Sequence, residues 1–275
     1  MGPASAAEQR LREGDLDAAL KLLQEEIRVR PADSKLRVFL FQLLSVLGRW
    51  DRALNQLDVA AKLDPAALAM AQMYGDAVRC EVLRAQVFEG KKVPMVFGQP
   101  EQWLALLIEA LMLSGRGRTP EAQTLRTQAF DQAPASKGTM DGQPFAWIAD
   151  ADMRFGPVLE AIINGRYYWV PFARLTRVAI DAPEDLRDLV WMPTHFQFEN
   201  GGESVALIPT RYPGSETATE STLALAKKTI WTESAPDCFF GLGQRILATD
   251  FGETPLTELR EVTLGEAEPD QAIQG

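Results

Sequence analysis

The stretch SKLRVFLFQLLSVLGRWDRALNQLDVAAKLDP, residues 34–65, decides the fold of the N-terminal half of the chain. Its first part carries apolar residues three and four positions apart, which places them on one face of a helix. Gly48 suits the left-handed conformation that closes a helix, and a second amphipathic run ends at Asp64-Pro65. The stretch therefore predicts two helices joined by a tight turn. One such hairpin cannot bury its own apolar face, so it needs neighbours of similar shape.

The hairpin has a partner 34 positions earlier in the chain. The residues that recur at this offset are Gly14, Leu16, Ala19, Leu20, Leu23 and Pro31, matching Gly48, Trp50, Ala53, Leu54, Leu57 and Pro65. This period and pattern resemble the tetratricopeptide repeat. A weaker third copy is predicted over residues 103–134, after a long helix over residues 66–89 that interrupts the period.

Stacked helical hairpins leave a concave surface that is lined by the first helix of each pair. On the helix that begins at Ser34, four residues lie opposite the apolar stripe: Lys35, Val38, Gln42 and Ser45. Such a groove suits an extended peptide or one amphipathic helix. We predict that these four residues contact a protein partner.

The pattern changes to short apolar runs separated by Gly and Asn turns after about residue 156. Residues 158–163 and 166–172 flank Asn164-Gly165, which is typical of a β-hairpin. Further strands are predicted within residues 175–180, 190–199, 204–212, 229–232, 243–249 and 259–264. The predicted fold class is α+β: TPR-like helical repeats (residues 1–134), a linker (135–156), a compact, small barrel-like antiparallel β domain (157–264) and a disordered acidic tail (265–275).

An aromatic run, Tyr167-Tyr168-Trp169, lies in the second strand of that hairpin. Alternation along a strand places Tyr167 and Trp169 on one face and Tyr168 on the other. We expect one face to fill the core of the β domain and the other to pack on the helices. The alternative is an aromatic surface that binds a peptide, for which Tyr168 is the candidate residue.

The composition limits the classes of partner and the compartment. A net charge of −10 on 275 residues argues against a nucleic-acid binder and against docking on anionic membranes. Two distant cysteines, Cys80 and Cys238, argue against a disulfide framework and favour a reducing compartment. The N-terminus shows no signal-like segment, and no apolar run is long enough to span a membrane, so we expect a cytoplasmic protein.

The sequence contains few residues that suggest catalysis. His195 is the single histidine, no Cys pair has metal-ligand spacing, and no Gly-x-Ser-x-Gly elbow is present. Gly241-Leu242-Gly243 lacks the third glycine of a dinucleotide site. We therefore predict no catalytic residue, metal or cofactor. Two alternatives stay open: an enzyme that uses His195 between the two domains, and a scaffold that self-assembles through the aromatic face.

Two stretches of the β region carry a family resemblance: NGRYYWVPFARLTRVAIDAPEDLRDLVWMP, residues 164–193, and ALIPTRYPGSE, residues 206–216. Together they resemble the ImpE/SciE family, also called TagJ, of bacterial type VI secretion accessory proteins. The resemblance implies a cytosolic, non-enzymatic adaptor that binds an N-terminal helix of the sheath subunit TssB. It also implies a link to ClpV, the ATPase that recycles contracted sheath. The resemblance assigns no binding residues.

Overall fold

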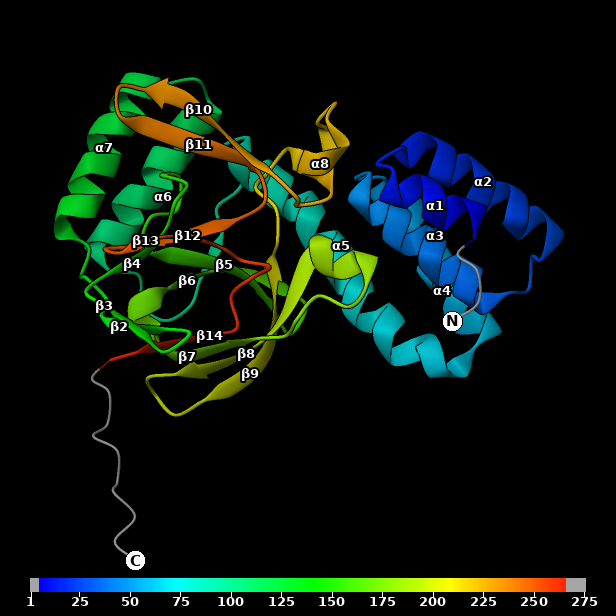
Figure 1. The fold of residues 1–275 in the computed structure, drawn as a ribbon. Helices are drawn as coiled ribbons and strands as arrows, with labels where there is room; N and C mark the ends of the chain where they lie inside the picture. The colour runs from blue at the N-terminus through cyan, green and yellow to red at the C-terminus, as the bar shows by residue number, and fades with distance from the viewer. Residues whose placement is uncertain (1–4, 266–275) are drawn as a thin grey trace, which may run out of the picture.

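A computed structural model describes residues 5–265 of the chain, and its elements are shown in Figure 1. The α-helices are α1 (Ala6–Arg12), α2 (Leu16–Val29), α3 (Ser34–Val46), α4 (Trp50–Leu63), α5 (Leu68–Phe88), α6 (Gln102–Gly115), α7 (Thr119–Gln132) and α8 (Ser221–Ala224). Four short 3-10 turns are η1 (Pro65–Ala67), η2 (Phe172–Arg174), η3 (Leu186–Leu189) and η4 (Ser215–Thr217). None of the helices within residues 5–265 combines the length and the apolar character needed to cross a bilayer.

The first two helical hairpins form as the repeat pattern predicts. Asp15 caps α2, where its side chain accepts a hydrogen bond of 3.0 Å from the amide of Ala18. Asp33 caps α3 in the same way. Gly14 and Gly48 close α1 and α3 with φ of +81° and +62°, a conformation that glycine adopts without steric cost.

The long helix α5 separates these two hairpins from the third one. Figure 1 shows α1–α4 at one end of the molecule and α6–α7 at the other, with α5 running between them. Helices α6 and α7 pair as an antiparallel hairpin, and α7 packs on strand β10 (Thr229–Ala235). The third hairpin therefore exists, but it does not extend the array of the first two.

The strands form one large sheet and two small ones. The large sheet has the order β1-β6-β5-β9-β8-β7-β14-β2-β3, and all neighbours are antiparallel except β1 and β6. Its strands are β1 (Met95–Val96), β2 (Gly138–Met140), β3 (Gln143–Phe145), β5 (Val158–Ile163), β6 (Arg166–Pro171), β7 (Leu175–Ile180), β8 (Trp191–Phe198), β9 (Glu203–Pro209) and β14 (Glu261–Leu264). The small sheets are β10-β11 and β13-β12-β4, with β4 (Ile148–Asp150), β11 (Cys238–Gly243), β12 (Ile246–Thr249) and β13 (Gly252–Pro255).

The expected barrel-like closure is not confirmed, because the large sheet is open. Its two edge strands, β1 and β3, are two and three residues long and do not pair with each other. The C-terminal region is therefore a sheet-rich domain. The predicted hairpin around Asn164-Gly165 is confirmed, and its turn residues have φ of +49° and +71°.

The segment predicted as a linker, residues 135–156, contains three strands. β2 and β3 extend the large sheet beyond β14, and β4 pairs with β12. Its turn-rich sequence reflects tight connections between short strands. The division of the chain into domains stays a prediction, and residues 266–275 of the predicted acidic tail lie outside the described residues.

The helices and the large sheet meet in one apolar cluster, while a second cluster lies on the other face of the sheet. Tyr167 and Trp169 belong to the first cluster and Tyr168 packs against the second, as strand alternation predicts. Trp191 of β8 lies at the centre of the junction, against an aromatic residue from each of three helices. These residues are Phe41 of α3, Trp50 of α4 and Tyr74 of α5, with ring centroids 5.8–6.4 Å from that of Trp191.

Candidate functional site

A hollow of about 330 Å³ lies beside the exposed side of α3 and contains three of the residues predicted from sequence. Lys35 is exposed, Val38 is half-buried and Gln42 is buried on successive turns of the helix. α3 also contributes Ser34 and Phe39 to the lining. The remaining residues come from α1, from η1 with the residue that caps it, and from the turn before η3: Glu8, Asp64, Ala67 and Asp185.

The acidic residues of this hollow stand at the beginnings of three short elements. Glu8 belongs to the capping box of α1, where its carboxylate accepts from the amide of Ser5 at 3.1 Å. The Asp64 side chain accepts from Ala66 at 3.0 Å at the start of η1. Asp185 caps η3 and also pairs with Arg187. Local capping therefore fixes three carboxylates around one apolar floor.

Ser45 and Tyr168, the other predicted contact residues, are not part of this hollow. Ser45 is fully buried, and its hydroxyl donates to the Phe41 carbonyl at 2.9 Å. Tyr168 lies on β6 against Phe97, with ring centroids 6.0 Å apart. The structure thus brings Lys35, Val38 and Gln42 together, separates Tyr168 from them, and leaves Ser45 without a surface to present.

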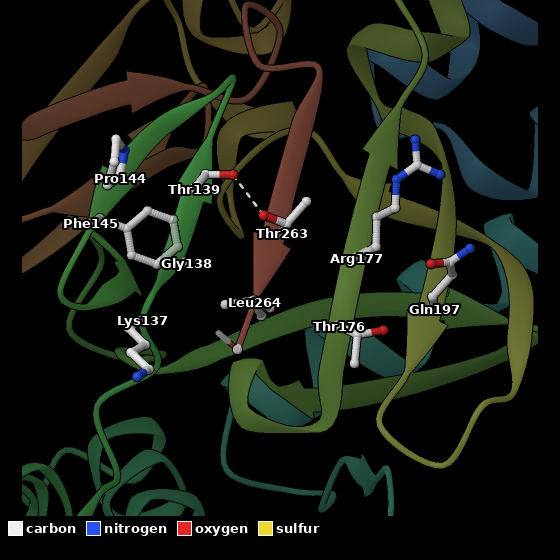
Figure 2. Close-up of a pocket in the computed structure, with 11 residues that line it drawn as sticks. Lys137, Gly138, Thr139, Pro144, Phe145, Thr176, Arg177, Gln197, Thr263 and Leu264 are labelled. Carbon is white, nitrogen blue, oxygen red and sulfur yellow. Dashed lines mark hydrogen bonds between the residues drawn. The ribbon is translucent and has the colours of Figure 1, made fainter. Parts of the chain in front are cut away.

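A larger depression of about 950 Å³ lies over β2, β14, β7 and β8. Figure 2 shows that its side chains come from several neighbouring strands and are spread over an open sheet surface. Its polar groups are used locally: Arg177 donates to Glu261 at 2.6 Å, and the hydroxyls of Thr139 and Thr263 lie 2.6 Å apart. These polar groups already have hydrogen-bond partners on neighbouring strands, so the depression offers few free polar groups to a ligand.

A buried ionic network lies between α5 and the sheet. Glu160 of β5 is fully buried and accepts hydrogen bonds from Arg84, Arg245 and Tyr167. The two bonds from Arg84 are 2.7 Å long, which gives the bidentate geometry of a strong guanidinium–carboxylate pair. Asp150 is the second carboxylate partner of Arg245. Helix α5, strand β5 and the β4–β12 sheet are therefore joined by paired charges.

The charged state of this network follows from the opposing effects of burial and ion pairing. Burial alone would raise the pKa of Glu160, but Arg84 and Arg245 lower it to about 2. For Glu81, which accepts from the Trp191 indole at 3.0 Å, burial dominates and raises the pKa. Glu160 is therefore ionised at neutral pH and holds two arginines.

Arg211 joins the end of α3 to the C-terminal region. Its guanidinium donates to the carbonyls of Val46 at 2.8 Å and Ser45 at 3.3 Å in the last turn of α3, and to Ala224 in α8. Cationic side chains suit helix C-termini, where carbonyl groups lack intrahelical partners. Burial lowers the pKa of Arg211 to about 10, so it stays charged at neutral pH.

His195 does not lie in a cleft between the helices and the sheet. It is exposed on β8, where it stands opposite Ala179 and Val205. Within residues 5–265 no group of three or more His, Cys, Asp or Glu side chains is placed to hold a metal ion. Cys80 and Cys238 are both buried and free.

Sequence reasoning missed the acidic lining of the hollow and the buried network. A carboxylate inside the apolar run of residues 158–163 was the available signal for Glu160, since a charge there must be paired. Asp64 precedes Pro65, and Asp185 follows Pro183 by two positions; both cap short 3-10 turns, but no local pattern places residue 185 next to α3. That proximity is set by tertiary packing of η3 on α3.

These features define a class: a helical-repeat protein whose first helices pack on a sheet-rich domain and border a small hollow. Comparisons with known proteins agree with both halves. Residues 10–74 match the tetratricopeptide repeat and residues 142–263 match the ImpE protein family. The type VI secretion system accessory component TagJ of Pseudomonas aeruginosa is 50% identical over 259 residues, covering 94% of this chain and 91% of that protein.

The chain belongs to the ImpE (TagJ) family of type VI secretion system accessory proteins. A crystal structure of a protein from Vibrio parahaemolyticus has the same fold, with a TM-score of 0.87 at 24% identity. The match covers 96% of this chain and 98% of that one. The two stretches quoted from the β region supply Tyr167, Trp169, Arg211 and Tyr212, which are all buried. These four residues of the family stretches therefore belong to the buried interior of the fold.

Proposed function

We propose that this protein is a non-enzymatic adaptor of the type VI secretion system that binds the N-terminal helix of the sheath subunit TssB. The helix docks in the hollow formed by α1, α3, η1 and the turn before η3. Through this contact the adaptor links the sheath subunit to sheath assembly or to ClpV-dependent recycling. Its work takes place in the cytoplasm, where sheath subunits are handled.

The observation that carries the proposal is the hollow beside α3 in a chain that is 50% identical to an accessory component of the system. Val38, Phe39 and Ala67 give it an apolar floor, and charged residues stand at its edge. An amphipathic helix is complementary to this surface, because its apolar side chains can cover the floor while its flanking polar side chains meet the charged edge. The exposed and isolated position of His195 favours binding over catalysis as the role of the chain.

Titration calorimetry of the full chain with a synthetic peptide of the TssB N-terminal helix tests the proposal. We expect binding with a dissociation constant of about 1–50 μM, as is common for a short helix in a small groove. Val38→Asp places a charge in the apolar floor and should weaken binding by about tenfold or more. No binding by the wild-type chain would overturn the proposal.

The matched control is Val205→Asp on the exposed sheet surface, where the valine is 53% exposed. This variant should bind the peptide as the wild-type chain does. Loss of binding in both variants would place the contact elsewhere or indicate a nonspecific charge effect. ClpV added to the preformed complex then tests the second link, which we expect to show as a larger assembly in light scattering.

A further inference from the structure

Gln42 is a largely buried side chain at the base of the α3 hollow. The residue is only 7% exposed and its side chain lines the hollow. Within residues 5–265 its amide has no hydrogen bond, in contrast to Gln56, which accepts a 3.2 Å bond from Arg37. Among the buried side-chain nitrogen and oxygen atoms of residues 5–265, those without a partner are Arg126 Nε and Arg187 Nε, so the Gln42 amide keeps access to the hollow. Its hydrogen-bonding capacity is therefore open to a polar group that a partner brings.

The charge around Gln42 indicates the sign of that group. Three carboxylates, from Glu8, Asp64 and Asp185, and one ammonium, from Lys35, line the hollow. Their formal sum is negative, and the net charge of −10 on the whole chain has the same sign. Arg187 pairs with Asp185 beside the hollow, and the carboxylate of Asp188 lies 3.9 Å from the same guanidinium. Arg187 and Asp188 thus add one positive and one negative charge, and the charge around the hollow stays negative.

We propose that the hollow receives a cationic side chain, lysine or arginine, from the partner helix, and that Gln42 recognises this side chain through a hydrogen bond. The amide oxygen of Gln42 accepts a hydrogen bond from the cation, and Glu8 and Asp64 stabilise its charge at the rim. The aliphatic stem of the cation packs along Val38 and Phe39, as long charged side chains do on apolar surfaces. This inference rests on the proposed function and adds the chemistry that selects the partner helix.

Two substitutions in the full chain give opposite expectations with the same TssB peptide. Gln42→Leu keeps the volume but removes the acceptor, and should weaken binding by about tenfold, as expected for loss of a hydrogen bond to a charged group. Lys35→Gln removes the like charge from the hollow and should tighten binding about twofold to fivefold. Raising the salt concentration from 50 to 300 mM should weaken wild-type binding. Gln197→Leu, in the sheet depression of Figure 2, is the matched control and should leave binding unchanged.

The outcomes separate the two proposals. If Val38→Asp abolishes binding while Gln42→Leu and Lys35→Gln have no effect, the helix docks in the hollow but no cation binds to Gln42. This inference is then wrong. If Lys35→Gln weakens binding instead, the partner supplies an anion and the inference is also wrong. If the wild-type chain does not bind the peptide at all, the proposed function fails, and the inference fails with it. Equal far-ultraviolet dichroism and melting temperatures verify that each variant is folded.

Discussion

Glu160 is a charged residue in a strand whose six residues are all buried. It is retained at this position because Arg84, Arg245 and Tyr167 satisfy its carboxylate and come from three different parts of the chain. Burying a charge costs several kcal/mol unless it is paired and hydrogen-bonded, so removal of one member leaves the others in an unfavourable state. At this scale the network defines the register between α5 and the sheet.

Glu160→Gln is expected to lower the free energy of unfolding by about 3–5 kcal/mol, because it leaves two buried guanidinium groups short of negative charge. The matched control is Glu261→Gln, which breaks a pair with Arg177 in which both side chains are 43% exposed. Exposed pairs contribute about 0–1 kcal/mol, so this variant should be nearly neutral. Urea unfolding followed by circular dichroism measures both, and equal losses would contradict the account.

The lowered pKa of Glu160 also predicts how stability depends on pH. Because its pKa falls from 4.5 to about 2 on folding, the stabilisation is complete above pH 4.5 and is lost as the pH falls toward 2. By pH 3 the wild-type chain should have lost about 2 kcal/mol from this group, at about 1.4 kcal/mol per pH unit. Burial raises the pKa of Asp150 to about 7, so its contribution to stability increases as the pH falls, opposite to that of Glu160. Asp150 is present in both the wild-type and the Glu160→Gln chains, so the comparison between them isolates Glu160.

Urea unfolding at pH 6 and pH 3 tests this expectation. The wild-type chain should lose about 2 kcal/mol more than Glu160→Gln between the two values. Parallel losses in the two chains would mean that Glu160 titrates normally in the folded state.

At the scale of elements, the turns of the first two hairpins rest on the segment that leads into α8. A methyl group added at Gly48 would lie 2.5 Å from the Glu216 side chain, and one at Gly14 would lie 3.0 Å from the Ser221 hydroxyl. The two glycines occupy the same position of the repeat. The repeat turns are therefore both helix-closing elements and contact points for the C-terminal region.

Gly48→Ala should destabilise the protein more than Gly117→Ala, by about 1–2 kcal/mol. Both glycines have positive φ, so both variants carry the backbone cost of alanine in that region, about 1 kcal/mol. Only Gly48 has a neighbour within contact distance, since the space around Gly117 is open to 4 Å. Thermal unfolding of the two variants measures the difference, and equal melting temperatures would show that the turn does not rest on Glu216.

The elements of the fold could be predicted from sequence to a large extent, because they follow local rules. The period of 34, the capping residues and the Asn-Gly turn each act within a few residues, and α1, α2, α3 and β5–β6 form where they predict. Strands β1, β2, β3, β4 and β13 were missed because two to four residues between turns give no alternation to detect. Strand β11 was missed because its glycines are typical of a bend, although they lie within the β10–β11 ladder.

The candidate site could be predicted only in part, for a physical reason. Lys35, Val38 and Gln42 follow from the face of one helix, which local spacing determines. Ser45 lies on the same face but near the end of α3, where Arg211 binds its carbonyl and the C-terminal region covers it. Which part of a helix face stays open depends on contacts between residues more than 150 positions apart, and no local pattern records them.

At the scale of the whole molecule, the hollow exists only because the helical array is held against the sheet-rich region. α3 supplies one wall and the turn before η3 another, and the two are separated by about 140 residues of chain. Arg211 and the aromatic group around Trp191 fix their relative position. Partner binding should therefore respond to changes that lie far from the hollow.

Arg211→Met is expected to speed amide exchange in the last turn of α3 and in α8, because the carbonyls of both helix ends lose their donor. Binding of the TssB peptide should weaken as η3 and α3 lose their fixed spacing. Arg174→Met is the control, since the ion pairs of Arg174 within residues 5–265 are surface pairs with Glu101 and Glu199. Hydrogen exchange with mass spectrometry measures the first effect, and unchanged exchange in α3 and α8 would contradict it.

The most direct test of the central claim is a hydrogen-exchange footprint of the full chain with and without the TssB N-terminal peptide at saturation. Binding in the hollow protects amides that the bound helix covers or stabilises. The account predicts slower exchange in α1, in the first half of α3, in η1 and in η3, with little change in β2, β7 and β14. Protection confined to the sheet depression over β2, β7 and β14, with α3 unchanged, would contradict it.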